Sequence, residues 1–133
     1  MFINFTNHPS KDWTNEQIAA AGEYGAILDI PFPEVDPNGD EDYIENLALN
    51  FTKQIIVYKP LAVLCQGEMT LAFAITAILI SKFGVTVIAA CSKRHSTEIV
   101  NANGTIAKRV EFKFTGFRKY SSNFYLTSKT ADI

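Results

Sequence analysis

The residues best suited to chemistry lie in short polar segments, and two of these segments can bind an anion and move a proton. Ser92, Lys93 and Arg94 follow an apolar run. An arginine grips a phosphate with two hydrogen bonds, and a lysine acts as a point charge. His8 could act as a general acid or base near neutral pH. A solvated turn at 92–94 and a loop histidine bonded to nearby backbone remain open alternatives.

The other polar candidates supply hydrogen bonds around these groups. Asn7 and Ser10 flank His8, and Gln66 and Gly67 stand before an apolar stretch that contains Thr70. The glycine lets a backbone approach a ligand closely, and free N–H groups that open a helix point at an anion. Glu68 in the same segment repels an anion, and as a first-turn acid it favours the helix dipole. Helix entry explains Ser10 equally well, and Trp13 fits either a hydrophobic anchor or a stacking platform.

Metal and cofactor signatures are missing from the sequence. Neither GxGxxG nor GxxxxGK[ST] occurs, and His8 and His95 have no carboxylate motif beside them. Cys65 and Cys91 are too few and too far apart for a zinc site or a disulfide framework. The sequence therefore predicts no cofactor and no metal, with free thiols in a reducing cytoplasm.

The charge distribution separates two halves of the chain. The 133 residues have a net charge of −2, but residues 1–60 hold ten acids and three bases, whereas 61–133 hold four acids and nine bases. The low total argues against a long nucleic acid as partner, because such binders are strongly basic. The basic second half suggests a small anionic partner, with a solvated basic hairpin as the plainer alternative.

Hydrophobic patterning predicts alternating strands and helices and then a hairpin. A capping box at Thr14 to Gln17 opens the first helix, and Asp40 caps the second. The third helix follows Glu68 and ends at Gly84. The expected strands cover 2–6, 26–30, 61–65 and 85–90, and the expected hairpin pairs 97–100 with 105–114.

This order predicts an α/β fold: a Rossmann-like three-layer sandwich with a mostly parallel sheet and a C-terminal β-hairpin. We expect one domain over 1–120 and a tail without clear pattern over 121–133. The apolar run 69–80 is too short to cross a bilayer, so no membrane contact is expected. With a strand order 2-1-3-4, residues 7–10 and 66–68 wall one crevice.

Several short motifs resemble a known family. These are the segments 4–10, 24–25, 29–33, 36–37, 66–68 and 117–118, together with Trp13. They are similar to small CRISPR-associated proteins of type III systems, in the compact ring-nuclease group with a CARF-like domain. The resemblance covers about residues 2–120.

The resemblance implies a homodimer that binds cyclic oligoadenylate, typically the four-membered ring, and cuts it without a metal. A ribose 2′-OH attacks the adjacent phosphate, which ends the antiviral signal. The catalytic residues expected on this basis are His8, Ser10, Lys93 and Arg94, and the expected ligand-binding residues are Asn7, Gln66, Gly67, Thr70 and Ser92. The alternative is a sensor or sponge that holds the nucleotide uncut.

Overall fold

The structure is a computed structural model that describes residues 1–125. It contains five strands, three α-helices and two short 3-10 helices. In chain order these are β1 Phe2–Phe5, η1 Ser10–Asp12, α1 Asn15–Gly22, β2 Ile27–Asp29, α2 Glu41–Ile56, β3 Ala62–Cys65, α3 Met69–Phe83, β4 Val87–Val100, β5 Ile106–Lys119 and η2 Ser122–Tyr125. Residues 126–133 of the expected tail lie outside the described residues.

The five strands form one mixed sheet in the order β2-β1-β3-β4-β5. The pairings β1–β2, β1–β3 and β3–β4 are parallel, and β4–β5 is antiparallel. The antiparallel pairing runs from Ile88↔Lys119 to Val100↔Ile106 and is much longer than any parallel one. The sheet is therefore mixed rather than mostly parallel, while the predicted α/β class and the C-terminal hairpin are confirmed. The strand order reverses between β1 and β3, where ligands bind in open α/β sheets.

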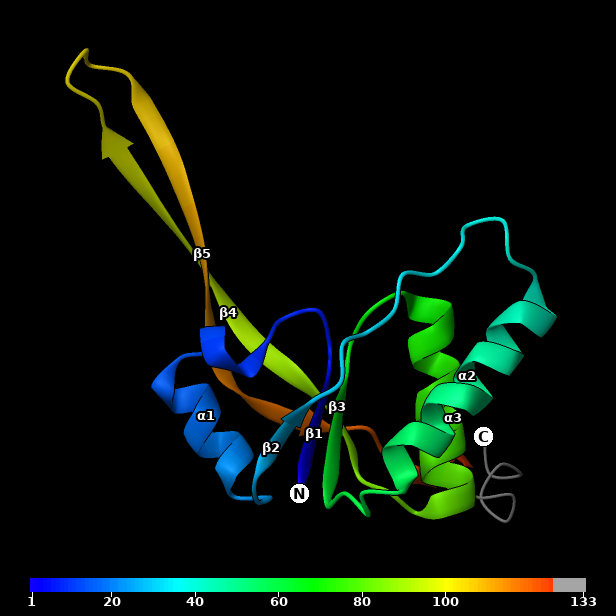
Figure 1. The fold of residues 1–133 in the computed structure, drawn as a ribbon. Helices are drawn as coiled ribbons and strands as arrows, with labels where there is room; N and C mark the ends of the chain where they lie inside the picture. The colour runs from blue at the N-terminus through cyan, green and yellow to red at the C-terminus, as the bar shows by residue number, and fades with distance from the viewer. Residues whose placement is uncertain (126–133) are drawn as a thin grey trace.

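Helices cover both faces of the sheet (Figure 1). On one face α2 and α3 pack over Ile3, Phe5 and Val63, all fully buried. On the other face α1 lies over Phe2 and Leu64. Successive residues of β1 and β3 thus serve opposite faces, which explains why these strands are apolar throughout. None of the helices within residues 1–125 is long and apolar enough to cross a membrane.

The predicted helix ends are confirmed by their caps. The Thr14 side chain accepts a hydrogen bond from the Gln17 backbone N–H, and the Asp40 carboxylate accepts one from Tyr43. Gly84 ends α3 in the left-handed conformation, at φ 61°. Polar caps and a glycine stop therefore set these boundaries, as their side-chain chemistry requires.

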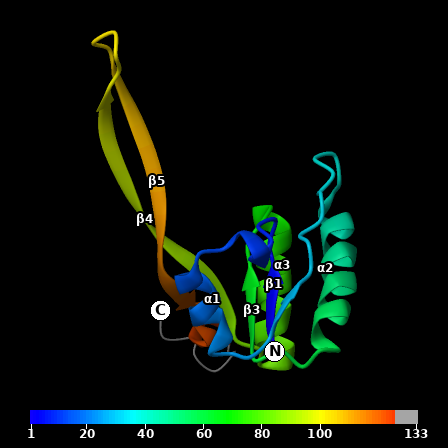
Figure 2. The ribbon, with the colours of Figure 1, turned by 60° about the vertical axis from the view of Figure 1, so that its left-hand side comes forward.

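The fourth strand differs most from the prediction. The expected strand over 85–90 and the first hairpin strand over 97–100 form one continuous strand, β4. Ser92, Lys93 and Arg94 therefore lie inside a strand and not in a loop. The polar run resembles a loop because both faces of this ribbon meet solvent. The β4–β5 ribbon extends away from the rest of the domain, as two views of the structure show (Figures 1 and 2).

Candidate functional site

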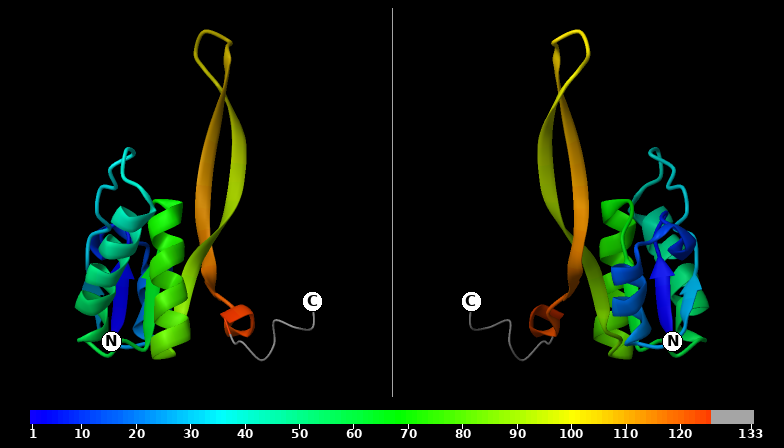
Figure 3. Two further views of the ribbon diagram at one scale, coloured as in Figure 1. Left: turned by 90° about the vertical axis from the view of Figure 1, so that its right-hand side faces the viewer. Right: turned by 90° about the vertical axis from the view of Figure 1, so that its left-hand side faces the viewer.

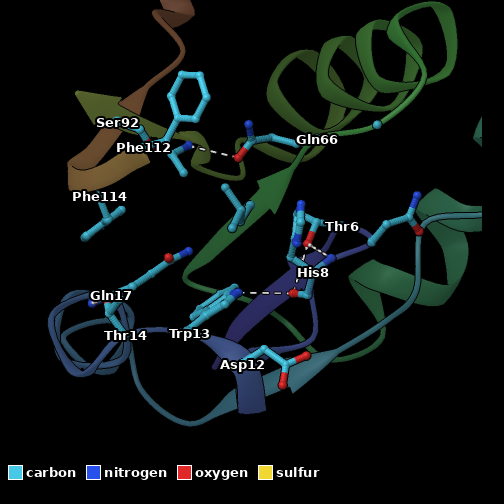
Figure 4. A pocket seen from close by; sticks show the side chains of 14 residues that line it. Thr6, His8, Asp12, Trp13, Thr14, Gln17, Gln66, Ser92, Phe112 and Phe114 are labelled. Carbon is cyan, nitrogen blue, oxygen red and sulfur yellow. Dashed lines mark hydrogen bonds between the residues drawn. The ribbon is translucent and has the colours of Figure 1, made fainter. Parts of the chain in front are cut away.

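A cavity of about 580 Å³ opens at the carboxyl edge of the sheet, between the β1 loop and the base of the β4–β5 ribbon. Five of the residues expected at a site line it: Asn7, His8, Gln66, Gly67 and Ser92. Further lining side chains come from η1, α1 and β5, and Figure 4 shows most of them: Asp12, Trp13, Thr14, Gln17, Phe112 and Phe114. Its volume falls within the usual range for small ligands, about 300–1,000 Å³.

The loop that carries His8 is fixed by hydrogen bonds to two buried polar side chains, Asn4 and Thr6. The amide of Asn4 donates to the His8 carbonyl and to Asp29 Oδ1, both at 2.9 Å. Thr6 Oγ1 donates to Asn4 Oδ1 at 2.8 Å and accepts from the His8 N–H at 3.1 Å. Asn4 is only 1% exposed. A satisfied buried network of this kind rigidifies the backbone it holds.

Ser10 belongs to this network and not to the cavity lining. Its N–H and its hydroxyl both donate to Asp29 Oδ2, at 3.1 and 3.0 Å. Asp29 thus ties the end of β2 to the start of η1. This geometry gives Ser10 a structural role in holding the loop, as the helix-entry alternative requires.

An aromatic chain connects the two sides of the cavity through the core. Trp13 meets Phe2 edge-on, with ring centroids 6.1 Å apart. Phe2 contacts Phe117 at 5.4 Å, and Phe117 contacts Phe114 at 5.0 Å. Trp13 and Phe114 both line the cavity, and they are connected through Phe2 and Phe117. Trp13 is both an anchor and part of the lining.

Gln66 and Gly67 occupy the β3–α3 junction expected at the crevice. Gln66 Oε1 accepts a hydrogen bond from the Ala90 N–H at 3.0 Å, which leaves its NH₂ group to donate to a ligand. A Cβ at Gly67 would overlap the buried ring of Phe32. The glycine is therefore required by a packed phenylalanine and not by a close approach to a ligand.

At the start of α3, two of the N–H groups predicted to point at an anion are already bonded within the chain. The Glu68 carboxylate accepts from the backbone of Thr70 and Leu71 and from the Thr70 hydroxyl. These bonds, led by the Thr70 hydroxyl, lower the pKa of Glu68. Thr70 faces a separate hollow beside the acidic start of α2. Thr70, expected to donate at the main cavity, therefore does not line it.

Lys93 and Arg94 point to opposite faces of the ribbon, because consecutive strand residues alternate. Arg94 pairs with Phe112 and Ser92 with Phe114, so all four share the face that lines the cavity. Lys93 pairs with Lys113 on the other face. The two cations therefore start from opposite faces of the ribbon, and Arg94 is the one on the face of the cavity-lining residues.

Sequence reasoning did not assign site roles to Asn4, Asp29, Gln17, Phe112 and Phe114. Asn4 had a usable signal, since it is the single polar residue in an apolar strand segment. Phe112 and Phe114 had no such sequence signal, because their position at the cavity depends on the register of the long hairpin. Within residues 1–125, no cluster of three or more metal-binding side chains occurs.

These features define an α/β protein with a ligand-sized polar and aromatic cavity at the carboxyl edge of a mixed sheet. The chain belongs to the family described as Uncharacterized protein MJ1673 family, whose model matches residues 1–118. No curated protein and no solved structure gives a significant match.

Proposed function

We propose that the protein binds a cyclic oligoadenylate, with cyclic tetra-adenylate as the expected ring, and cleaves it without a metal. One observation carries the proposal: the cavity places aromatic rings, amide groups and a histidine beside a cationic strand. A nucleotide needs this combination, because its base is planar and its phosphate is anionic.

The cavity suits one part of such a ring. The half-buried Trp13 and Phe114 offer aromatic faces for a base, and the amides of Gln17 and Gln66 offer groups for its polar edge. Stacking of a base on an aromatic side chain contributes about 1–3 kcal/mol. A volume of about 580 Å³ holds a portion of the ring. A homodimer with two such cavities accommodates the whole ring, as the resemblance implies.

Cleavage in this proposal uses the substrate's own nucleophile. A ribose 2′-oxygen bonds to the adjacent phosphorus and loses its proton to solvent, while the bond from phosphorus to the 5′-oxygen breaks. His8 protonates the leaving 5′-oxygen, and Arg94 stabilises the charge on the phosphoryl oxygens. The products are a 2′,3′-cyclic phosphate and a 5′-hydroxyl. The fixed loop around His8 supports this role, because proton transfer needs a positioned donor.

The finer fold assignment belongs to the same proposal. We infer a Rossmann-like, CARF-type domain from the order β2-β1-β3-β4 and from helices on both faces. With that assignment, ring cleavage switches off type III CRISPR signalling.

Binding without cleavage is the second candidate, and one observation favours it. Of the four residues expected to be catalytic, only His8 lines the cavity, and the Ser10 hydroxyl is bonded to Asp29. A sensor or sponge needs the aromatic and amide lining and no proton donor.

The test is incubation of the purified protein with cyclic tetra-adenylate, with and without EDTA, followed by mass spectrometry and calorimetry. Linear products with a 2′,3′-cyclic phosphate, formed equally with EDTA, support the nuclease. Tight binding with the ring recovered intact supports the sensor. A ring that is neither bound nor cut contradicts both.

Adjacent cations provide matched variants for this test. Arg94→Ala removes the cation on the cavity face, and Lys93→Ala removes its neighbour on the other face. We expect the arginine variant to lose about tenfold or more in affinity, because charge-assisted bonds contribute roughly 1.5–3 kcal/mol. The lysine variant should lose less. Equal losses would contradict the assignment of Arg94 to the phosphate.

A further inference from the structure

The outer part of the β4–β5 ribbon, residues 92–113, is an arm that stands clear of the body (Figure 3). The turn from Asn101 to Thr105 joins the β4 and β5 segments of the arm. Every one of its residues is exposed. Nine residues from Ser92 to Val100 make it about 30 Å long.

The arm has two chemically different faces. Cross-strand pairs place four of the five exposed large apolar residues of the arm on one face, which we term the apolar face, while the fifth, Ile99, lies on the opposite face. The apolar face also carries Arg94, Glu98 and Lys108. Its apolar members are Val100, Ile106, Val110 and Phe112, which are 72%, 65%, 41% and 70% exposed. The opposite face carries Lys93, Lys113 and the ion pair between Arg109 and Glu111. Such a pattern is typical of a sheet with one covered face.

Nothing within residues 1–125 covers the apolar face. A two-stranded ribbon alone is marginally stable in water, because each strand has only one neighbour and neither face is buried. Exposed apolar residues gathered on one side indicate a partner surface rather than scattered exposure. The apolar face is thus suited to docking on protein.

The charge of the arm indicates which protein surface it docks on. The arm carries five bases and two acids, whereas residues 34–45, which we term the acidic rim, carry six acids and no base. Both rise from the same end of the sheet but on opposite sides of the molecule, and Figures 1 and 2 agree on this. Within one chain they do not meet. A second copy brings a complementary rim to each arm.

We propose that two copies dock reciprocally, each arm laying its apolar face across the carboxyl edge of the other copy toward the partner's acidic rim. A two-fold axis satisfies both contacts at once, since each copy gives an arm and receives one. Phe112 of the apolar face also lines the cavity, next to Ser92 and Phe114 at the base of the ribbon. The partner therefore covers the mouth of each cavity. The inference rests on the homodimer in the proposed function and not on ring cleavage.

Two neighbouring residues give the decisive test. Val100→Asp places a charge on the apolar face, and Ile99→Asp places the same charge one residue away on the opposite face. Light scattering over a dilution series, without nucleotide, should give twice 14.8 kDa for wild type and for Ile99→Asp. Val100→Asp should raise the dimer dissociation constant about tenfold or more, since a buried unpaired charge costs over 1.4 kcal/mol. Ile106→Asp should repeat this loss, and circular dichroism checks that all variants are folded.

Charge reversal tests the acidic rim separately. Lys108→Glu, on the apolar face, or Glu41→Lys, in the acidic rim, should each weaken the dimer, and combining the two in one chain should restore it. Failure of the combination to restore it overturns the docking toward the rim.

A monomeric wild type, or equal effects of Val100→Asp and Ile99→Asp, overturns the inference. A monomer that still cleaves the ring leaves the proposed cleavage standing. A dimer that neither binds nor cleaves the ring leaves the arm interface standing.

Discussion

The indole nitrogen of Trp13 donates a hydrogen bond to the carbonyl oxygen of His8, at 3.1 Å. One aromatic residue thus lines the cavity and also holds the loop that presents its histidine. The same carbonyl accepts from the Asn4 amide. The cavity lining and the buried network therefore form one unit.

Two variants of Trp13 separate these roles. Trp13→Phe keeps an aromatic ring and loses the N–H, so unfolding free energy should fall by about 1 kcal/mol while nucleotide affinity changes little. Trp13→Ala removes the ring as well, and affinity should fall about tenfold or more from lost stacking. Urea unfolding and calorimetry measure the two effects. Equal affinity losses in both variants would show that Trp13 acts only through the loop.

Asn4 is the centre of the polar network below the loop. Asn4→Ala removes the amide that joins Asp29 Oδ1, the His8 carbonyl and the Thr6 hydroxyl, so unfolding free energy should fall by about 2–3 kcal/mol. Hydrogen exchange at residues 7–10 should also accelerate. The control is Asn46→Ala at an exposed position of α2, which should stay within about 0.5 kcal/mol. An Asn4 variant as stable as this control would contradict the role assigned to the network.

Gly67 tests whether packing or ligand access requires a glycine. Gly67→Ala forces a methyl group into the ring of Phe32, and overpacking of this kind costs about 1–3 kcal/mol. Gly22→Ala, in open space at the end of α1, is the matched control and should be neutral or slightly stabilising. If packing is the reason, adding Phe32→Leu to Gly67→Ala should cost less than the sum of the single changes. If the losses of unfolding free energy add, contact with Phe32 is not what requires a glycine at position 67.

Local signals predicted most elements, and long-range pairing decided the rest. Caps at Thr14 and Asp40 and the stop at Gly84 depend on neighbours in sequence, so they were readable. The length of β4 could not be predicted from sequence neighbours, because its polar residues are stabilised by β5 across the ribbon. The same pairing places Lys93 and Arg94 on opposite faces.

The crevice between the first and third strands followed from topology, and its loops do line one cavity. The sequence predicts Ser10 and Thr70 at the same crevice because their loops meet that edge. Their side chains are instead bonded to Asp29 and Glu68. Which acceptor a hydroxyl finds depends on three-dimensional neighbours that residue spacing does not encode.

The two thiols differ in burial. Burial raises the pKa of Cys65 to about 11, partly offset by a hydrogen bond from Thr76. A thiolate is the reactive form, and at pH 8 a thiol with that pKa is ionised in about one molecule per thousand. Iodoacetamide should therefore modify the half-buried Cys91 first and leave Cys65 intact in the folded protein, whereas urea should equalise them. Peptide mass spectrometry follows both sites. Raising the pH toward 11 should increase the thiolate fraction at Cys65 while the fold persists. Native labelling of Cys65 at the rate of Cys91 would contradict the burial of β3.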